Sequence, residues 1–267
     1  MFVTINDHFT RLVDVGEGPR VLVTHGGWTG NWELWEQQAA ALSRQGWRVI
    51  AYDHRGAGQS QATPAQITLD ALVDDLFAVL DHCGVDRCVL AGESMGALVV
   101  LRAAERAPER FAGLLIAGGT ARFPKSLQLR AFRLGLHTAY RLTLRNFLML
   151  AVPERDVRRH IRRWGLSILR QATRPNARRL VGVMYGVDQR DIAARVSVPT
   201  VVVHGKKDRI VPFRLGEELA TLLPDCRFVP LDDAGHVPTL TRPDRIISEL
   251  QRLADSVQLD AAPLQRW

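Results

Sequence analysis

"AGESMGALVV", residues 91–100, places Ser94 between Gly92 and Gly96, where an apolar run ends and a helical pattern begins. The run before the serine is typical of a buried β-strand, and the residues after it predict a helix over 95–107. In such a tight strand-to-helix turn, side chains two positions from the serine would collide with the neighbouring chain, so glycine is favoured there. The stretch therefore predicts a strand, a sharp turn that projects Ser94, and a helix. The alternative is a small-residue turn that only packs the helix on the strand.

Strand-like and helix-like segments alternate along most of the chain. Predicted strands are "RVLVTHGG" (20–27), "WRVIAYD" (47–53), "RCVLAGES" (87–94), "AGLLIAGG" (112–119), "VPTVVVHG" (198–205) and a shorter last one in "CRFVPLDDAGH" (226–236). Predicted helices cover 32–45, 68–83, 95–107, 214–223 and 242–254. Because the strands are apolar on both faces, we expect an α/β fold with a mostly parallel central sheet flanked by helices.

One interval breaks this alternation and carries most of the positive charge. Residues 122–195 contain no strand-like run and hold 17 Lys+Arg against 4 Asp+Glu, a net charge of +13, whereas the rest of the chain holds 18 against 24, a net of −6. We therefore expect an α/β core formed by 1–121 and 196–267, with an arginine-rich helical cap at 122–195 inserted after the strand that follows the Ser94 helix. The cap lacks the interleaved aromatics or the module of a nucleic-acid binder, so no nucleic-acid partner is expected.

Composition narrows the class of protein further. Apolar residues make up 46% of the 267 residues, and no uncharged apolar run is long enough to span a membrane. The N-terminus has no apolar signal region, so we expect a cytoplasmic protein. Cys83, Cys88 and Cys226 are too few and too scattered for a disulfide framework or a metal cluster, and no metal is expected.

A serine hydroxyl becomes a nucleophile only when a base takes its proton and an acid orients that base. "VVVHGKKDRIVP" supplies Asp208 in a turn after a late strand, and "PLDDAGHVP" supplies His236 after the last one. The order Ser94, Asp208, His236 is the one expected when all three lie at the carboxyl edge of such a sheet. Asp232 and Asp233 also compete as the acid, although their closeness to His236 in sequence favours a role in shaping the loop.

Three other histidines lie near strand ends but fit the role of base less well. His25 and His54 sit in turns, where structural hydrogen bonding is the favoured role. His204 precedes the turn that carries Asp208 and is not expected to reach Ser94.

Attack on a carbonyl creates an oxyanion, which two backbone N–H groups must stabilise. One is expected from Met95, directly after the serine, and the other from "HGGW" at 25–28, with Gly27 as first choice and Trp28 as the alternate. The same loop alternatively reads as a plain Gly-Gly turn. Trp28 is also a candidate for lining the substrate pocket.

Taken together, these motifs resemble the α/β-hydrolase superfamily, specifically its compact, cap-bearing esterase-like members. "HGGWTGNW", "YDHRGAGQS", "GESMG", "HGKKDRIVP" and "AGHVP" carry the resemblance over most of the chain. It implies Ser94 as nucleophile, His236 as base and Asp208 as the orienting acid. Serine at 94 argues against the dehalogenases and epoxide hydrolases that resemble this scaffold but use aspartate. Glu93 departs from the histidine or tyrosine often found beside the nucleophile, so the resemblance does not predict the chemistry of the pocket next to Ser94.

The resemblance implies a serine hydrolase that cleaves a carboxylic ester or thioester through an acyl-enzyme, with no metal and no organic cofactor. Alternatives on the same fold are a carbon–carbon bond hydrolase, a perhydrolase, or a ligand receptor with slow turnover. The cap offers a further alternative, an interaction protein that binds an acidic partner without chemistry.

Arginines in "ERDVRRHIRRWGLSILRQA" recur at helical spacing and predict one strongly basic helix face. The candidates for contacting the substrate or a partner are Arg155, Arg158, Arg159 and Arg162. Such a face suits an acyl carrier protein, the phosphates of a coenzyme A thioester or a substrate carboxylate. The competing interpretation is a solvated, arginine-rich surface.

Overall fold

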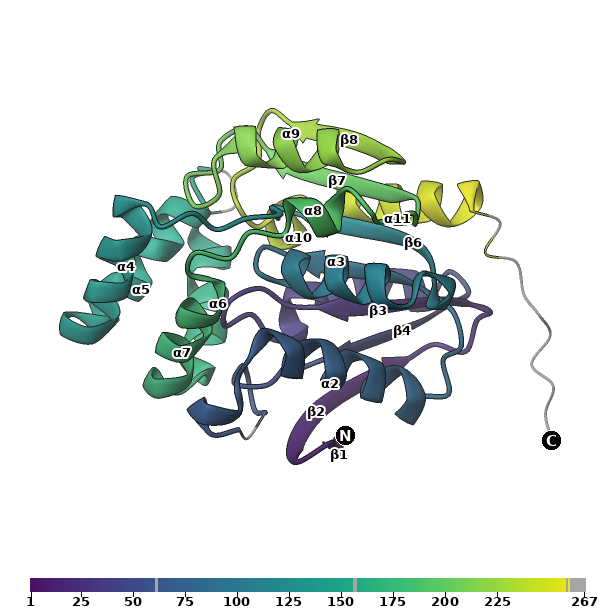
Figure 1. The fold of residues 1–267 in the computed structure, drawn as a ribbon, viewed down its shortest axis with the longest axis horizontal. Helices are drawn as coiled ribbons and strands as arrows, with labels where there is room; N and C mark the ends of the chain where they lie inside the picture. The colour runs from purple at the N-terminus through teal and green to yellow at the C-terminus, as the bar shows by residue number, and fades with distance from the viewer. Residues whose placement is uncertain (61, 156–157, 258, 260–267) are drawn as a thin grey trace.

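A mostly parallel β-sheet runs through the computed structural model, which describes residues 1–60, 62–155, 158–257 and 259 (Figure 1). Its eight strands are β1 (Phe2–Ile5), β2 (His8–Val15), β3 (Arg20–His25), β4 (Trp47–Tyr52), β5 (Cys88–Glu93), β6 (Phe111–Ala117), β7 (Thr200–Gly205) and β8 (Cys226–Leu231), in the spatial order β1-β2-β4-β3-β5-β6-β7-β8. The pairs β1–β2 and β2–β4 are antiparallel, and all later pairs are parallel.

Helices cover both faces of the sheet. On one face α1 (Glu36–Ser43) packs on α11 (Pro243–Ser256), and on the other α2 (Leu69–His82), α3 (Gly96–Arg106), α8 (Arg190–Ala193) and α9 (Phe213–Leu222) form a contiguous layer. In Figure 1, α2, α3 and α8 lie in front of the strands. Short helices η1 (Trp32–Trp35), η2 (Pro64–Gln66), η3 (Pro108–Arg110) and α10 (Pro238–Thr241) lie in connections. The predicted α/β fold with a mostly parallel, two-sided sheet is confirmed.

The central strands explain why the apolar runs lack alternation. Every residue of β5, β6 and β7 is buried. Because helices cover both faces of these strands, side chains that point in either direction enter the core, and valine, leucine, isoleucine and alanine follow one another.

Strands β1 and β2 were not predicted from the sequence. In β2 the pattern is inverted at its start, because Phe9 is 57% exposed while His8 and Thr10 are buried. Thr10 can point inward because its hydroxyl hydrogen-bonds to the Asp53 carbonyl and the Ser60 hydroxyl, which replaces the hydrogen bonds lost to water. A search for apolar residues on the inner face therefore cannot find this strand.

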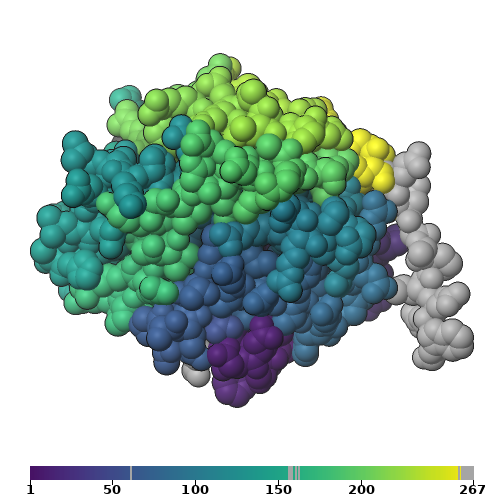
Figure 2. Space-filling model, viewed as in Figure 1, coloured from purple at the N-terminus to yellow at the C-terminus, as the bar shows by residue number. Residues whose placement is uncertain are grey.

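Between β6 and β7 the chain forms helices with no strand among its described residues, as the sequence predicts. These are α4 (Leu127–Thr138), α5 (Tyr140–Ala151), α6 (Arg158–Gln171) and α7 (Arg174–Met184), followed by α8, and we call α4–α7 the cap helices. The hairpin of α4 and α5 forms one end of the molecule, beyond the edge of the sheet (Figures 1 and 2). Ser126 begins α4 by accepting a hydrogen bond from the Leu129 N–H at 3.2 Å.

Parallel strands bring their carboxyl ends to one edge. His25, the last residue of β3, is in register with Gly92 of β5, so the loop after β3 lies beside the turn after β5. Gly205 of β7 is in register with Leu231 of β8 in the same way. The four loops that carry the predicted site residues thus meet at this edge, beneath the cap helices.

Candidate active site

Ser94 occupies the sharp turn between β5 and α3. Its φ of 53° lies in the left-handed region that non-glycine residues rarely adopt. A Cβ on Gly92 would lie 2.6 Å from Val100 Cγ2, and a Cβ on Gly96 would lie 2.8 Å from the Gly26 carbonyl oxygen. Glycine is therefore required on both sides of the serine, as its spacing in the sequence predicts.

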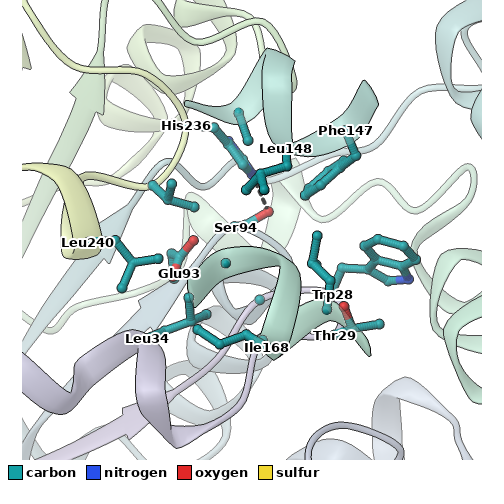
Figure 3. Close-up of a pocket in the computed structure, with 16 residues that line it drawn as sticks. Trp28, Thr29, Leu34, Glu93, Ser94, Phe147, Leu148, Ile168, His236 and Leu240 are labelled. Atoms are coloured by element: carbon teal, nitrogen blue, oxygen red, sulfur yellow. Dashed lines mark hydrogen bonds between the residues drawn. The ribbon is translucent and has the colours of Figure 1, made fainter. Parts of the chain in front are cut away.

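A continuous chain of hydrogen bonds joins Ser94, His236 and Asp208. His236 Nε2 is 2.9 Å from Ser94 Oγ, and His236 Nδ1 is 2.8 Å from Asp208 Oδ2 (Figure 3). All three residues are buried, with 7%, 1% and 8% of their surface exposed, respectively. The arrangement leaves one imidazole between a hydroxyl and a carboxylate, which is the geometry that general-base activation of a serine requires.

The Asp208 carboxylate is held by more groups than the sequence indicates. Its Oδ1 accepts hydrogen bonds from the N–H groups of Ile210 at 2.8 Å and Val211 at 2.9 Å. His204 Nε2 lies 3.2 Å from Oδ2. Burial alone would raise the pKa of Asp208, but the charge of His236 and the hydrogen bonds from both histidines outweigh it and hold the pKa below its usual range. The contact with His204 was not predicted, because the sequence places that residue before the turn.

His236 is placed by the chain around it and by an aromatic ring. The backbone N–H of His236 donates to the Ala151 carbonyl at 2.8 Å, and the ring of Phe147 lies edge-on to the imidazole at 6.3 Å between centroids. Burial acts to lower the pKa of His236, but the negative charges of Asp208 and Glu93 and the hydrogen bond to Asp208 outweigh it and raise that pKa. The imidazole is therefore suited to take up a proton.

The loop after β3 packs against Ser94 through Gly27. A Cβ on Gly27 would stand 3.3 Å from Ser94 Cβ, so this loop packs directly against the serine. Among the described residues, neither the Gly27 N–H nor the Met95 N–H donates a hydrogen bond. Two unpaired amides beside the hydroxyl suit the stabilisation of a developing oxyanion.

Two stacked histidines fix this loop. His25 Nδ1 donates to the Gly26 carbonyl at 2.8 Å and His54 Nε2 donates to the Gly27 carbonyl at 2.8 Å. Their rings are 4.8 Å apart and nearly parallel. Burial, together with the neighbouring His54, lowers the pKa of His25 to about 3, and burial lowers that of His54 as well. Both rings are therefore neutral hydrogen-bond donors that orient the loop, which agrees with the structural role expected of them.

Two cavities meet at Ser94. A smaller one of about 50 Å³ extends between the core and the cap helices α5 and α6, and a larger one of about 570 Å³ extends beneath α4 and α5. Trp28 and Phe147 line both of them. Apolar side chains such as Phe123, Phe132 and Met184 dominate the larger cavity. A carbonyl held at Ser94 can thus extend one substituent into each space.

Glu93 is a buried acid whose role is not predicted from the sequence. It is 2% exposed and lines the smaller cavity, where its Oε2 accepts a hydrogen bond from the Thr239 hydroxyl at 3.1 Å (Figure 3). Burial raises the pKa of Glu93 to about 7, and the charge of Asp208 acts in the same direction. An acid residue beside the nucleophile is visible in the sequence, but its burial in an apolar cavity is not.

Of the other predicted site residues whose side chains are described, only Trp28 lines the cavities at Ser94. Trp28 is buried between the cavities, and its Nε1 donates to the Ala177 carbonyl at 2.8 Å. Arg155 and Arg159 are exposed and line neither cavity. The side chains of Arg158 and Arg162 lie outside the part of the structure that is described. Among the described residues there is no group of three His, Cys, Asp or Glu side chains suited to a metal ion, and no helix long and apolar enough to cross a membrane.

Residues 19–239 match the family model described as serine aminopeptidase, S33. The chain belongs to this family, within the α/β-hydrolase superfamily. It is 27% identical to the AB hydrolase superfamily protein YisY of Bacillus subtilis, over 96% of this chain and 99% of that protein. It is 26% identical to the pimeloyl-(acyl-carrier protein) methyl ester esterase of Aliivibrio fischeri, over 88% of this chain and 93% of that protein.

Solved structures agree with this assignment. A thermophilic esterase from Thermogutta terrifontis superposes with a TM-score of 0.83 at 27% identity, covering 96% of this chain and 98% of the other. A bromoperoxidase from Bacillus anthracis superposes with a TM-score of 0.87 at 23% identity, covering 96% and 99%, and shows the same fold. The chain is therefore a member of the α/β-hydrolase superfamily, and its relatives support ester hydrolysis in general.

Proposed function

We propose that this chain hydrolyses a carboxylic ester or thioester through an acyl-enzyme formed on Ser94. The observation that carries the proposal is the unbroken hydrogen-bonded chain Asp208–His236–Ser94 beside the unpaired amides of Gly27 and Met95. Acyl transfer needs a nucleophile, a base, an acid that orients the base and two oxyanion donors, and these groups support such a reaction here.

In the first half of the reaction His236 Nε2 takes the Ser94 proton as Oγ attacks the carbonyl carbon. The amides of Gly27 and Met95 donate to the resulting oxyanion, and Asp208 stabilises the imidazolium. The carbon–oxygen or carbon–sulfur bond to the leaving group then breaks, and His236 returns the proton to that group. In the second half, His236 takes a proton from the water that attacks the acyl-enzyme; the bond between the acyl carbon and Oγ then breaks, the acid is released, and His236 returns the proton to Ser94 Oγ.

The apolar lining of the larger cavity favours an apolar substituent on the carbonyl. Removal of such a group from water is favourable by about 25 cal/mol per Å² of buried apolar surface. We therefore expect kcat/KM to rise with chain length across a series of p-nitrophenyl esters.

The test compares hydrolysis of these esters by the unaltered protein, by Ser94→Ala and by Ser167→Ala, an exposed serine of α6 that serves as the matched control. S94A should lose all hydrolysis above background and S167A should lose none. If both variants hydrolyse normally, the proposal is wrong. If neither they nor the unaltered protein turns the esters over, a dienol ketone and acetate with peroxide test the carbon–carbon hydrolase and perhydrolase alternatives. A ligand that binds tightly with negligible turnover would favour the receptor.

We also propose that the basic face at the start of α6 receives an anionic or carrier-linked acyl substrate. Its support is the exposure of Arg155 and Arg159, and the resemblance to the methyl ester esterases that act on pimeloyl-(acyl-carrier protein). If the face docks a carrier, the double variant R155Q/R159Q should lower kcat/KM for the carrier-linked ester but not for the free ester, and salt should have the same effect. Equal rates on both forms would make this face a solvated surface.

A further inference from the structure

The α4–α5 hairpin exposes large apolar side chains that no residue described in the structure covers. Leu127, Leu134, Leu142 and Met149 are 81%, 63%, 57% and 48% exposed, respectively. Leu127 and Leu134 are seven residues apart on α4, and Leu142 and Met149 are seven apart on α5, so each pair lies on one face of its helix. Outside the hairpin, the exposed large apolar residues are only Met1, Phe2 and Phe9 among those the structure describes.

The same hairpin is basic throughout. From Arg110 to Pro153 the sequence has no Asp or Glu. Lys125, Arg130, Arg141 and Arg145 are exposed, and among the described residues none of them forms an ion pair. Cationic side chains are thus interspersed with exposed leucines, and no negative charge balances them from within the hairpin.

The hairpin also borders the entrance of the larger cavity. Leu150 of α5 is 36% exposed and lines this cavity, and so does Ala131 of α4, which is exposed as well. The cavity continues past Phe132 and Phe147 to Ser94. Figure 1 shows the hairpin projecting from one end of the fold, where α4 and α5 lie side by side. An apolar cavity therefore leads from Leu150, on the surface of the hairpin, to the serine.

We propose that the α4–α5 hairpin docks on a lipid surface that carries anionic headgroups. Exposed leucines insert among acyl chains at the depth of the headgroups, and the surrounding cations attract an anionic leaflet. A second copy of the chain is a poor occupant, because two hairpins with only positive charge repel each other. An acidic protein would satisfy the arginines, but it gives no reason for four leucine and methionine side chains to stand exposed at helical spacing.

Docking in this orientation sets the substrate class as well. A water-insoluble ester with a long apolar chain would pass from the lipid phase along the hairpin into the larger cavity. This second statement rests on the proposed ester hydrolysis, whereas docking itself does not, since vesicle binding is measured without turnover.

The test is sedimentation of the full chain with vesicles of phosphatidylcholine alone and of an equal mixture of phosphatidylcholine and phosphatidylglycerol. The unaltered protein should bind the mixed vesicles and bind phosphatidylcholine weakly, and high salt should release it. The variants L127S/L134S, L142S/M149S and R130Q/R141Q/R145Q should each lower the partition coefficient for the mixed vesicles by about tenfold or more.

Matched controls come from the opposite end of the chain and from other surfaces. Phe9→Ser removes an apolar side chain that is 57% exposed on β2. R44Q/R87Q removes two exposed cations from the surface of the α/β part of the chain, away from the cap helices. Both should leave vesicle binding unchanged, and thermal unfolding verifies that every variant folds.

Three results would overturn docking on lipid: no binding to the mixed vesicles, binding that the hairpin variants leave intact, or an acidic carrier protein that binds the hairpin when vesicles do not. Dimerisation that the leucine substitutions abolish, with no vesicle binding, would assign the face to a second copy instead. If vesicles bind but S94A and the unaltered protein are equally inactive, docking stands and the proposed chemistry fails.

Discussion

Glu93→Gln tests the electrostatics of the site in a way that can be worked out in advance. Glu93 is buried beside Ser94 in a cavity whose other walls are mainly apolar, and burial raises its pKa from an ordinary 4.5 to about 7. A shift of this size corresponds to about 3 kcal/mol of difference between the folded and unfolded chain. Glutamine keeps the shape and the ability to accept from Thr239, but it cannot ionise.

Glu93 ionises at a lower pH in the unfolded chain than in the folded chain, and this sets the direction in which stability changes with pH. As pH rises above about 4.5, the unfolded chain releases this proton to water while the folded chain still holds it, until pH passes about 7. The free energy of unfolding of the unaltered protein therefore falls by about 3 kcal/mol over this range through Glu93, and then stays lower. The variant lacks this loss, so its stability relative to the unaltered protein should rise by about 3 kcal/mol.

Urea unfolding followed by tryptophan fluorescence measures this difference at about pH 5 and about pH 8.5, on either side of the transition. Glu36→Gln, at an exposed position on α1, is the matched control and should give the same difference at both pH values. If the E93Q difference changes by less than about 1 kcal/mol between the two pH values, the account of Glu93 as a buried acid is refuted.

Three further predictions concern the reaction and the turn. Asp208→Asn should lower kcat by about 10⁴-fold without loss of fold. The N–H groups of Ile210 and Val211 would hold the amide oxygen, so its NH2 group would face His236 Nδ1, favour the wrong tautomer and remove the negative charge; a loss under tenfold would contradict this role. Because the charges of Asp208 and Glu93 raise the pKa of His236 above 6.5, kcat/KM should fall with acid through a midpoint above that value, and E93Q should move the midpoint to lower pH; an unmoved midpoint would count against coupling between the two groups. Gly92→Ala should lower the free energy of unfolding by about 2 kcal/mol or more in thermal unfolding, since its Cβ would lie 2.6 Å from Val100, and an unchanged midpoint would show that the turn has room.

The sequence is informative where one loop at a strand end carries the decisive residue. Ser94, Asp208 and His236 each lie in the loop that follows a parallel strand, so knowing the strand order is enough to expect them at one sheet edge. Gly92 and Gly96 could be read in the same way, because the turn admits no side chain at either position.

Features that depend on contacts between distant segments could not be predicted. His204 reaches Asp208 only because the turn after β7 folds back on its own strand. The pKa of Glu93 depends on walls that the cap helices and α10 supply, far away in sequence. The helical spacing of the arginines predicts a basic face, but not that Arg155 and Arg159 lie outside both cavities. The exposed leucines of the hairpin look like core residues until the neighbouring helices are placed.

Rapid-quench mass spectrometry of the intact chain with a p-nitrophenyl ester shows whether Ser94 carries the acyl group. We expect a burst of one p-nitrophenol per chain, a mass increase of one acyl group, and assignment of that group to the peptide containing Ser94. Acylation of another residue, or turnover of the ester with no acyl-enzyme and no burst, would contradict this assignment.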